Sequence, residues 1–142
     1  MQLQGTRWWA DEQGRDLVTL AAALPSETAS IEDIIAMADA NGIGEPFRLL
    51  LDAGQRHGLP LRPYRVKVMV TAPTNRNRML YTLDAQARDD RLHLYISPDA
   101  FAEALQVPPA DATKLLGKDE ERWLTPIEAQ QLVMQLDQLL SR

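Results

Sequence analysis

Apolar and polar side chains alternate along the middle of the chain, from Leu61 to Ile96. Because successive side chains of a β-strand point to opposite faces of the sheet, this alternation predicts strands. Two stretches that are rich in turn-forming or polar residues, Ala72–Asn77 and Asp84–Asp90, interrupt it and are typical of loops. We therefore predict a three-stranded antiparallel meander over residues 61–96.

The alternation gives the predicted sheet an apolar face and a basic face. The apolar positions of the three strands are Tyr64, Val66, Val68, Val70, Met79, Tyr81, Leu83, Leu92, Leu94 and Ile96. The positions between them are Arg65, Lys67, Met69, Arg78, Leu80, Thr82, Arg91, His93 and Tyr95. We expect the apolar face to pack on helices, because an antiparallel sheet commonly has one buried and one solvated face.

Helical patterns flank these strands on both sides. Apolar residues recur with helical spacing within residues 30–58, around a break at Asn41–Gly44, which predicts a helical hairpin. Further helices are expected within residues 98–141, the last of them opened by the capping box Thr125-Pro126-Ile127-Glu128. The predicted fold class is α+β, with the meander packed against flanking helices in a single domain of residues 1–142.

The helical hairpin also fits a helix-turn-helix, in which the second helix enters a DNA groove. That helix offers only Arg48, Gln55 and Arg56 for such contacts. A plain helical hairpin explains the same pattern.

Residues 1–25 fit an additional N-terminal β-hairpin or an arm, with the hairpin over residues 6–20. Trp8 and Trp9 are neighbours there, so they would point to opposite faces of a strand. At least one of them is then exposed unless a helix or a partner covers it. Both are candidate partner-binding residues, although a Trp that caps the edge of the core accounts for the same pattern.

Charge is segregated along the chain. Residues 56–93 hold eight of the fifteen Lys and Arg residues against three of the twenty acids, although the whole chain has a net charge of −5. The middle of the chain is therefore basic and the remainder acidic. This asymmetry predicts either an anionic partner for the basic face or an acidic helix of the same chain that covers it, and solvated charge on an open sheet is also ordinary.

The composition indicates a soluble globular protein in a reducing compartment. The absence of cysteine excludes a disulfide scaffold and a thiolate metal site. The N-terminal sequence has no basic segment followed by an apolar run, as a secretory signal would, and the longest nearly apolar run, Leu17–Leu24, is far too short to span a membrane. We expect a cytoplasmic protein that does not associate with a membrane.

The chain carries no motif of catalytic, metal or cofactor chemistry. His57 and His93 lie in different predicted elements, without the spacing of metal ligands. Gly42-Ile43-Gly44 lacks the remaining glycine of a nucleotide-binding loop. We predict a non-enzymatic binding module without a metal or a cofactor.

Nucleic acid is the most concrete partner for the basic face. Its candidate contact residues are Arg65, Lys67, Asn75, Arg76, Arg78, Arg91, His93 and Tyr95. The cationic side chains on the strands would contact phosphates, Tyr95 would stack on an exposed base, and Asn75 and Arg76 at a hairpin tip would fix the register. The alternative is a protein-interaction subunit or a homodimer that uses Trp8 and Trp9 or the open sheet face.

Part of the sequence resembles known domains. The segments that carry the likeness are Arg62–Val70, Pro73–Leu80, Leu92–Tyr95, Phe101–Glu103 and Trp123. They resemble uncharacterised bacterial domains and, in broad layout, the YjbR-type small proteins, in which a hairpin sheet is followed by helices and a late Trp. The likeness covers roughly residues 45–140. It implies an α+β fold and a suspected role in DNA binding, and it supplies no catalytic residues.

Overall fold

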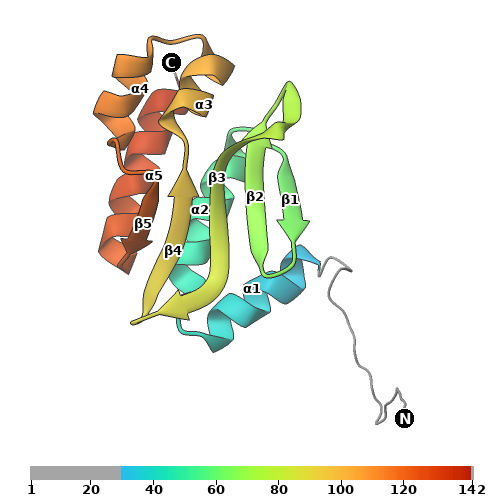
Figure 1. Ribbon diagram of the computed structural model, residues 1–142. Coiled ribbons are helices and arrows are strands. Elements are labelled where there is room, and N and C mark those ends of the chain that lie inside the picture. The colour runs from blue at the N-terminus through green and yellow to red at the C-terminus, as the bar shows by residue number, and fades with distance from the viewer. Residues whose placement is uncertain (1–29, 142) are drawn as a thin grey trace, which may run out of the picture. The chain divides into compact units, whose positions relative to one another are not determined.

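The computed structural model describes residues 30–141 (Figure 1). The predicted hairpin over residues 6–20, with Trp8 and Trp9, lies outside the described residues. In chain order, the elements within residues 30–141 are α1 (Ile31–Ala40), α2 (Gly44–Arg56), β1 (Leu61–Tyr64), β2 (Lys67–Ala72), β3 (Asn75–Arg88), β4 (Arg91–Ile96), α3 (Pro98–Leu105), α4 (Pro109–Leu116), β5 (Glu121–Leu124) and α5 (Pro126–Leu140).

The five strands of this part of the chain form one antiparallel sheet in the order β1-β2-β3-β4-β5. Together with five helices, they confirm the α+β class. The predicted number of strands, three, is too small for two reasons. A tight turn at Arg65 and Val66 divides the first predicted strand into β1 and β2, and Glu121–Leu124 joins the sheet beside β4 as β5.

The turn between β1 and β2 changes the face on which Tyr64 lies. Tyr64 pairs with Lys67 across the turn, and Arg65 has a positive φ of 57°. The predicted place of Tyr64 in the core is wrong, since its side chain is 49% exposed. The turn escapes prediction because neither Arg65 nor Val66 belongs to the residue types that usually form turns.

Most of the second predicted loop is strand. β3 continues to Arg88, and only Asp89 and Asp90 form the turn, with φ values of 54° and 59°. A two-residue hairpin turn of this kind needs positive φ at both central positions, which Asp tolerates better than most residues. Asp84 is therefore a strand residue, opposite Lys67 in β2 and His93 in β4.

The helices cover one face of the sheet. α1 and α2 contact each other and β3, α5 contacts α2 and β5, and α3 packs on α4, which also contacts α5. Figure 1 shows α2 behind the strands, α1 below them and α3 and α4 above them, with no helix of residues 30–141 across the front of the sheet. Of the positions predicted for the apolar face, Val68, Val70, Tyr81, Leu83, Leu92, Leu94 and Ile96 are buried in this core. Val66, in the β1–β2 turn, and Met79 are only half-buried. Leu80, predicted for the basic face, is also buried, because the register of β2 and β3 shifts beside it.

A glycine lets α2 approach the sheet closely. A Cβ atom on Gly54 would lie 2.9 Å from the hydroxyl oxygen of Tyr81 and 3.1 Å from a methyl carbon of Val70. The same Tyr81 hydroxyl donates a hydrogen bond of 2.6 Å to the carbonyl oxygen of Leu50. The small side of α2 and a buried tyrosine thus fix the distance between the helix and the strands.

Side-chain caps and ion pairs hold the helices in place. The predicted capping box is confirmed: Thr125 accepts from the backbone N–H of Glu128, and the Glu128 carboxylate accepts from that of Thr125. Arg56 and His57 both contact the Asp137 carboxylate, which joins the end of α2 to α5. Arg48 pairs with an aspartate of α1. The two arginines that a helix-turn-helix would offer to DNA are therefore paired with carboxylates.

Candidate nucleic-acid interface

One face of the sheet carries no helix of residues 30–141, and we call it the open face. Its side chains are Arg62, Tyr64, Lys67, Met69, Thr82, Asp84, Arg91, His93, Tyr95, Glu121 and Trp123. Arg88 joins them at the turn, directly opposite Arg91. Every strand of the sheet contributes, so residues far apart in the sequence share one surface.

Five of these side chains form a contacting group that we call the His93 cluster: Asp84, His93, Tyr95, Glu121 and Trp123. The strand register places His93 opposite Trp123, and Tyr95 opposite Glu121. The imidazole of His93 stacks on the indole of Trp123, with ring centroids 4.0 Å apart and planes 6° from parallel. The Tyr95 ring lies 4.8 Å from the imidazole at an angle of 57°. Two adjacent strands thus present three aromatic rings in contact.

Two carboxylates flank the imidazole of His93. Its Nε2 atom is 2.7 Å from Oε2 of Glu121, and its Nδ1 atom is 3.5 Å from Oδ2 of Asp84. Because an ionised carboxylate can only accept hydrogen bonds, Nε2 carries the proton in the shorter contact. The hydroxyl of Tyr95 donates to the same Glu121 oxygen over 3.1 Å. Asp84 is held from its own strand, where it accepts from the backbone N–H of Gln86 at 2.9 Å.

These contacts favour ionised Glu121 beside a protonated phenol. The hydrogen bond from His93, followed by that from Tyr95, holds the pKa of Glu121 below its usual value. The hydrogen bond to Glu121 raises the pKa of Tyr95. At neutral pH the cluster therefore contains a fixed negative charge at Glu121, and the Tyr95 hydroxyl keeps its proton.

Cationic side chains lie against two of the rings. The ammonium nitrogen of Lys67 is 5.8 Å from the centroid of the Tyr95 ring. The guanidinium carbon of Arg88 is 5.4 Å from the centroid of the Trp123 ring. Both distances are in the range of cation–π attraction. Positive charge thus borders the aromatic surface on both sides.

Two basic hollows lie at opposite edges of the open face. Arg88, Asp89, Arg91 and Trp123 line one of about 290 Å³ beside β5. The other, of about 300 Å³, is lined by Arg62, Arg76 and Asn77, where Arg62 lies within 3.4 Å of the Asn77 side-chain oxygen. Each hollow brings two guanidinium groups together, an arrangement that suits an anionic ligand.

The structure brings together only some of the predicted contact residues. Lys67, Arg91, His93 and Tyr95 share the open face, as the alternation predicts. Arg65 lies in the β1–β2 turn instead of on a strand, and Arg78 pairs with Glu103 of α3 at 2.9 Å. Asn75 and Arg76 are exposed at the start of β3, next to the tip formed by residues 73 and 74.

Sequence reasoning missed the partners of His93. Trp123 and Glu121 alternate with buried or half-buried neighbours over only four residues, too short a pattern to assign a face. The sequence pattern places Asp84 in a loop, yet it lies on the open face and is only 8% exposed. The pairing of β3, β4 and β5 brings these residues together, and no local sequence pattern predicts that pairing.

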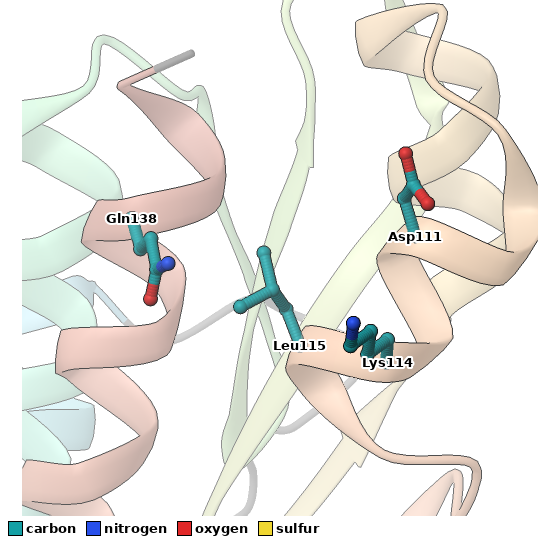
Figure 2. Close-up of a pocket in the computed structure, with 4 residues that line it drawn as sticks. All are labelled: Asp111, Lys114, Leu115 and Gln138. Atoms are coloured by element: carbon teal, nitrogen blue, oxygen red, sulfur yellow. The ribbon is translucent and has the colours of Figure 1, made fainter.

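Hollows on the helices are weaker candidates. One hollow, of about 410 Å³, is lined by Asp111, Lys114 and Leu115 of α4 and by Gln138 of α5. Figure 2 shows Leu115 projecting from α4 toward the side of α5 that carries Gln138. The lining mixes one acid, one base, one amide and one apolar side chain, so no single ligand chemistry is favoured there.

Within residues 30–141, no group of three His, Asp or Glu side chains is placed to hold a metal ion. None of the helices in that range has the length and apolar character required to cross a membrane. What the geometry defines is an α+β domain whose open sheet face combines aromatic rings with cations. Comparison with known proteins finds no matching family model, no matching curated relative and no matching solved structure.

Proposed function

We propose that this protein binds single-stranded nucleic acid across the open face of its sheet. The observation that carries the proposal is the aromatic surface of the exposed Tyr95 and the half-buried Trp123, held together by the largely buried ring of His93. Lys67 and Arg88 lie against the rings of Tyr95 and Trp123. Unpaired bases stack on such side chains, at about 1–3 kcal/mol per base, while neighbouring cations attract the backbone. A duplex hides the faces of its bases, so the surface favours a single strand.

Four cations on this face are suited to phosphates. Arg62, Lys67, Arg88 and Arg91 lie on four different strands. From β1 to β5 the sheet spans four interstrand spacings of about 4.8 Å each, or about 19 Å, which accommodates several nucleotides. Arg76, at the start of β3, extends the row beside Arg62, whereas Arg78 contributes less because Glu103 already pairs with it.

The His93 cluster supports binding more than nucleophilic catalysis. Both ring nitrogens of His93 face carboxylates, Glu121 at 2.7 Å and Asp84 at 3.5 Å. A general base needs a free ring nitrogen within hydrogen-bond reach of the group that it deprotonates. The imidazole therefore serves as a stacked ring and as a hydrogen-bond donor to Glu121.

A titration of labelled single-stranded and double-stranded oligonucleotides tests the proposal, at about 50 and 200 mM salt, where phosphate contacts are visible. The double variant Lys67→Gln/Arg88→Gln removes two positive charges from the open face. Lys114→Gln/Lys118→Gln is the matched control, since it removes two charges from the α4 region. We expect weaker single-strand binding only in the first variant. Equal affinities of the two double variants for the single strand, or no binding by the unaltered chain at low salt, would refute the proposal.

A protein partner is the second candidate, and one observation favours it. Tyr64 is 49% exposed on the open face, which also carries Met69 of the neighbouring strand. A homodimer through this surface would shift in sedimentation with protein concentration and would respond little to salt. A monomer that shifts only with a single strand would support the first candidate instead.

A further inference from the structure

Glu121 is an acid within a surface that otherwise presents cations and aromatic rings. It lies directly opposite Tyr95, and its side chain is 51% exposed. A carboxylate repels phosphates, so its presence weakens any binding that depends on the backbone alone. Two donors nevertheless hold this carboxylate in one place, His93 at 2.7 Å and Tyr95 at 3.1 Å.

One oxygen of Glu121 accepts no hydrogen bond from the described residues and is proposed here as the contact for a ligand. Both hydrogen bonds reach Oε2, and among residues 30–141 none reaches Oε1. An ionised carboxylate accepts hydrogen bonds and cannot donate them. Within the part of the chain that the structure describes, the site therefore offers a fixed acceptor without a hydrogen-bond donor of its own, at the border of an aromatic surface.

The four bases differ in the donors that they present to such an acceptor. The Watson–Crick edge of guanine has two adjacent donors, N1–H and the N2 amino group. Adenine and cytosine each place one amino group beside an acceptor nitrogen, and uracil places one N–H between two carbonyl oxygens. An acceptor next to the donor repels a carboxylate, so guanine alone matches Oε1 with two donors.

We propose that the open face selects guanine, with Glu121 accepting hydrogen bonds from N1–H and N2–H of a base that stacks beside it. Tyr95 takes part twice, because its ring supports the base and its hydroxyl positions the carboxylate. His93 also has two contacts: its ring stacks on Trp123, and its Nε2 atom hydrogen-bonds to Glu121. This inference rests on the proposed binding of single strands and adds the identity of one base.

Fluorescence anisotropy with labelled single-stranded RNA tests the inference. The probes are oligouridines of equal length with guanine, adenine, cytosine or inosine at one central position. We expect guanine to bind about tenfold more tightly than adenine or cytosine, near the lower end of the range for two hydrogen bonds to one base, because both donors share the single oxygen Oε1. Inosine lacks the N2 amino group and should lose several-fold of that advantage.

Glu121→Gln should abolish the preference for guanine while overall binding stays equal or becomes tighter, because a repulsive charge is lost. Glu120→Gln removes the same charge from the neighbouring exposed residue and should leave the preference intact. Equal binding of all four probes, or a preference for another base, would overturn the inference and leave the proposed function standing. If no probe binds at low salt, the proposed function itself falls. The inosine comparison needs no variant, so it decides the question even if Glu121→Gln is unstable.

Discussion

The salt dependence of single-strand binding follows from the cations on the open face. The perturbation is Lys67→Gln, which removes the ammonium group that lies against the Tyr95 ring. Four cations, Arg62, Lys67, Arg88 and Arg91, are on the face before the change and three after it. Each neutralised phosphate of a single strand contributes about −0.7 to the slope of log K against log salt.

Four phosphate contacts predict a slope of about −2.8, equivalent to about a 50-fold loss of affinity between about 50 and 200 mM salt. With three contacts the slope becomes about −2.1 and the loss about 18-fold. The ratio of the affinity of the unaltered chain to that of the variant should therefore fall by about 2.6-fold between the two salt concentrations. Loss of the contact between Lys67 and the Tyr95 ring changes log K by the same amount at every salt concentration, so it does not change the slope of log K against log salt.

Anisotropy titrations at four or five salt concentrations measure this slope directly. Lys118→Gln is the control, because Lys118 is exposed in the segment between α4 and β5. Equal slopes for the unaltered chain and Lys67→Gln would show that Lys67 makes no phosphate contact. A slope that changes as much in Lys118→Gln would show that the cations act through total charge and not through their place on the face.

Three further predictions concern stability, measured by urea unfolding. Gly54→Ala should lower the free energy of unfolding, because the added methyl carbon would lie 2.9 Å from the Tyr81 hydroxyl oxygen. Overpacking of this kind costs about 1–3 kcal/mol, against roughly 1 kcal/mol gained in helix propensity. Equal or greater stability of the variant would contradict the close approach of α2 to the sheet. Thr125→Ala should cost about 1 kcal/mol by removing the helix cap, whereas an unchanged midpoint would deny the capping box a role. The hydrogen bond from His57 holds the pKa of Asp137 below its ordinary value of 3.8. A depressed pKa stabilises the fold above that value and loses its effect as the pH falls, so Asp137→Asn should destabilise at neutral pH and the difference should vanish in acid. A difference that persists at low pH would exclude this cause.

Local signals predicted the parts of the fold that depend on neighbours in the chain. The capping box at Thr125 and the alternation of buried residues from Val68 to Ile96 are examples, since each depends only on residues close together in the sequence. The β1–β2 turn was missed because Arg65 and Val66 continue the alternation without any turn-forming residue. As a result, the segment predicted as one strand is two strands, β1 and β2, and Tyr64 lies on the open face and not in the core.

The candidate site was predicted in part for the same reason. Lys67, His93 and Tyr95 follow from period two along β2 and β4. The stack of His93 on Trp123 depends on β4 pairing with a short strand that follows two helices, and the register of that pairing is a tertiary property. The likeness to YjbR-type proteins stays a prediction, as does the role of Trp8 and Trp9.

Chemical-shift mapping of the full chain with single-stranded RNA tests the central claim most directly. Backbone amides would be labelled with nitrogen-15, and the indole signal of Trp123 would be assigned through a Trp123→Phe variant. We predict that the largest changes occur at Lys67, at His93 and Tyr95 in β4, at β5, and at the Trp123 indole, because these groups form the aromatic and cationic part of the open face. Amides of α1 and α2, on the other face of the sheet, should change little. Changes concentrated on α1 and α2 with the open face unaffected, or none at all with RNA in excess, would contradict the account.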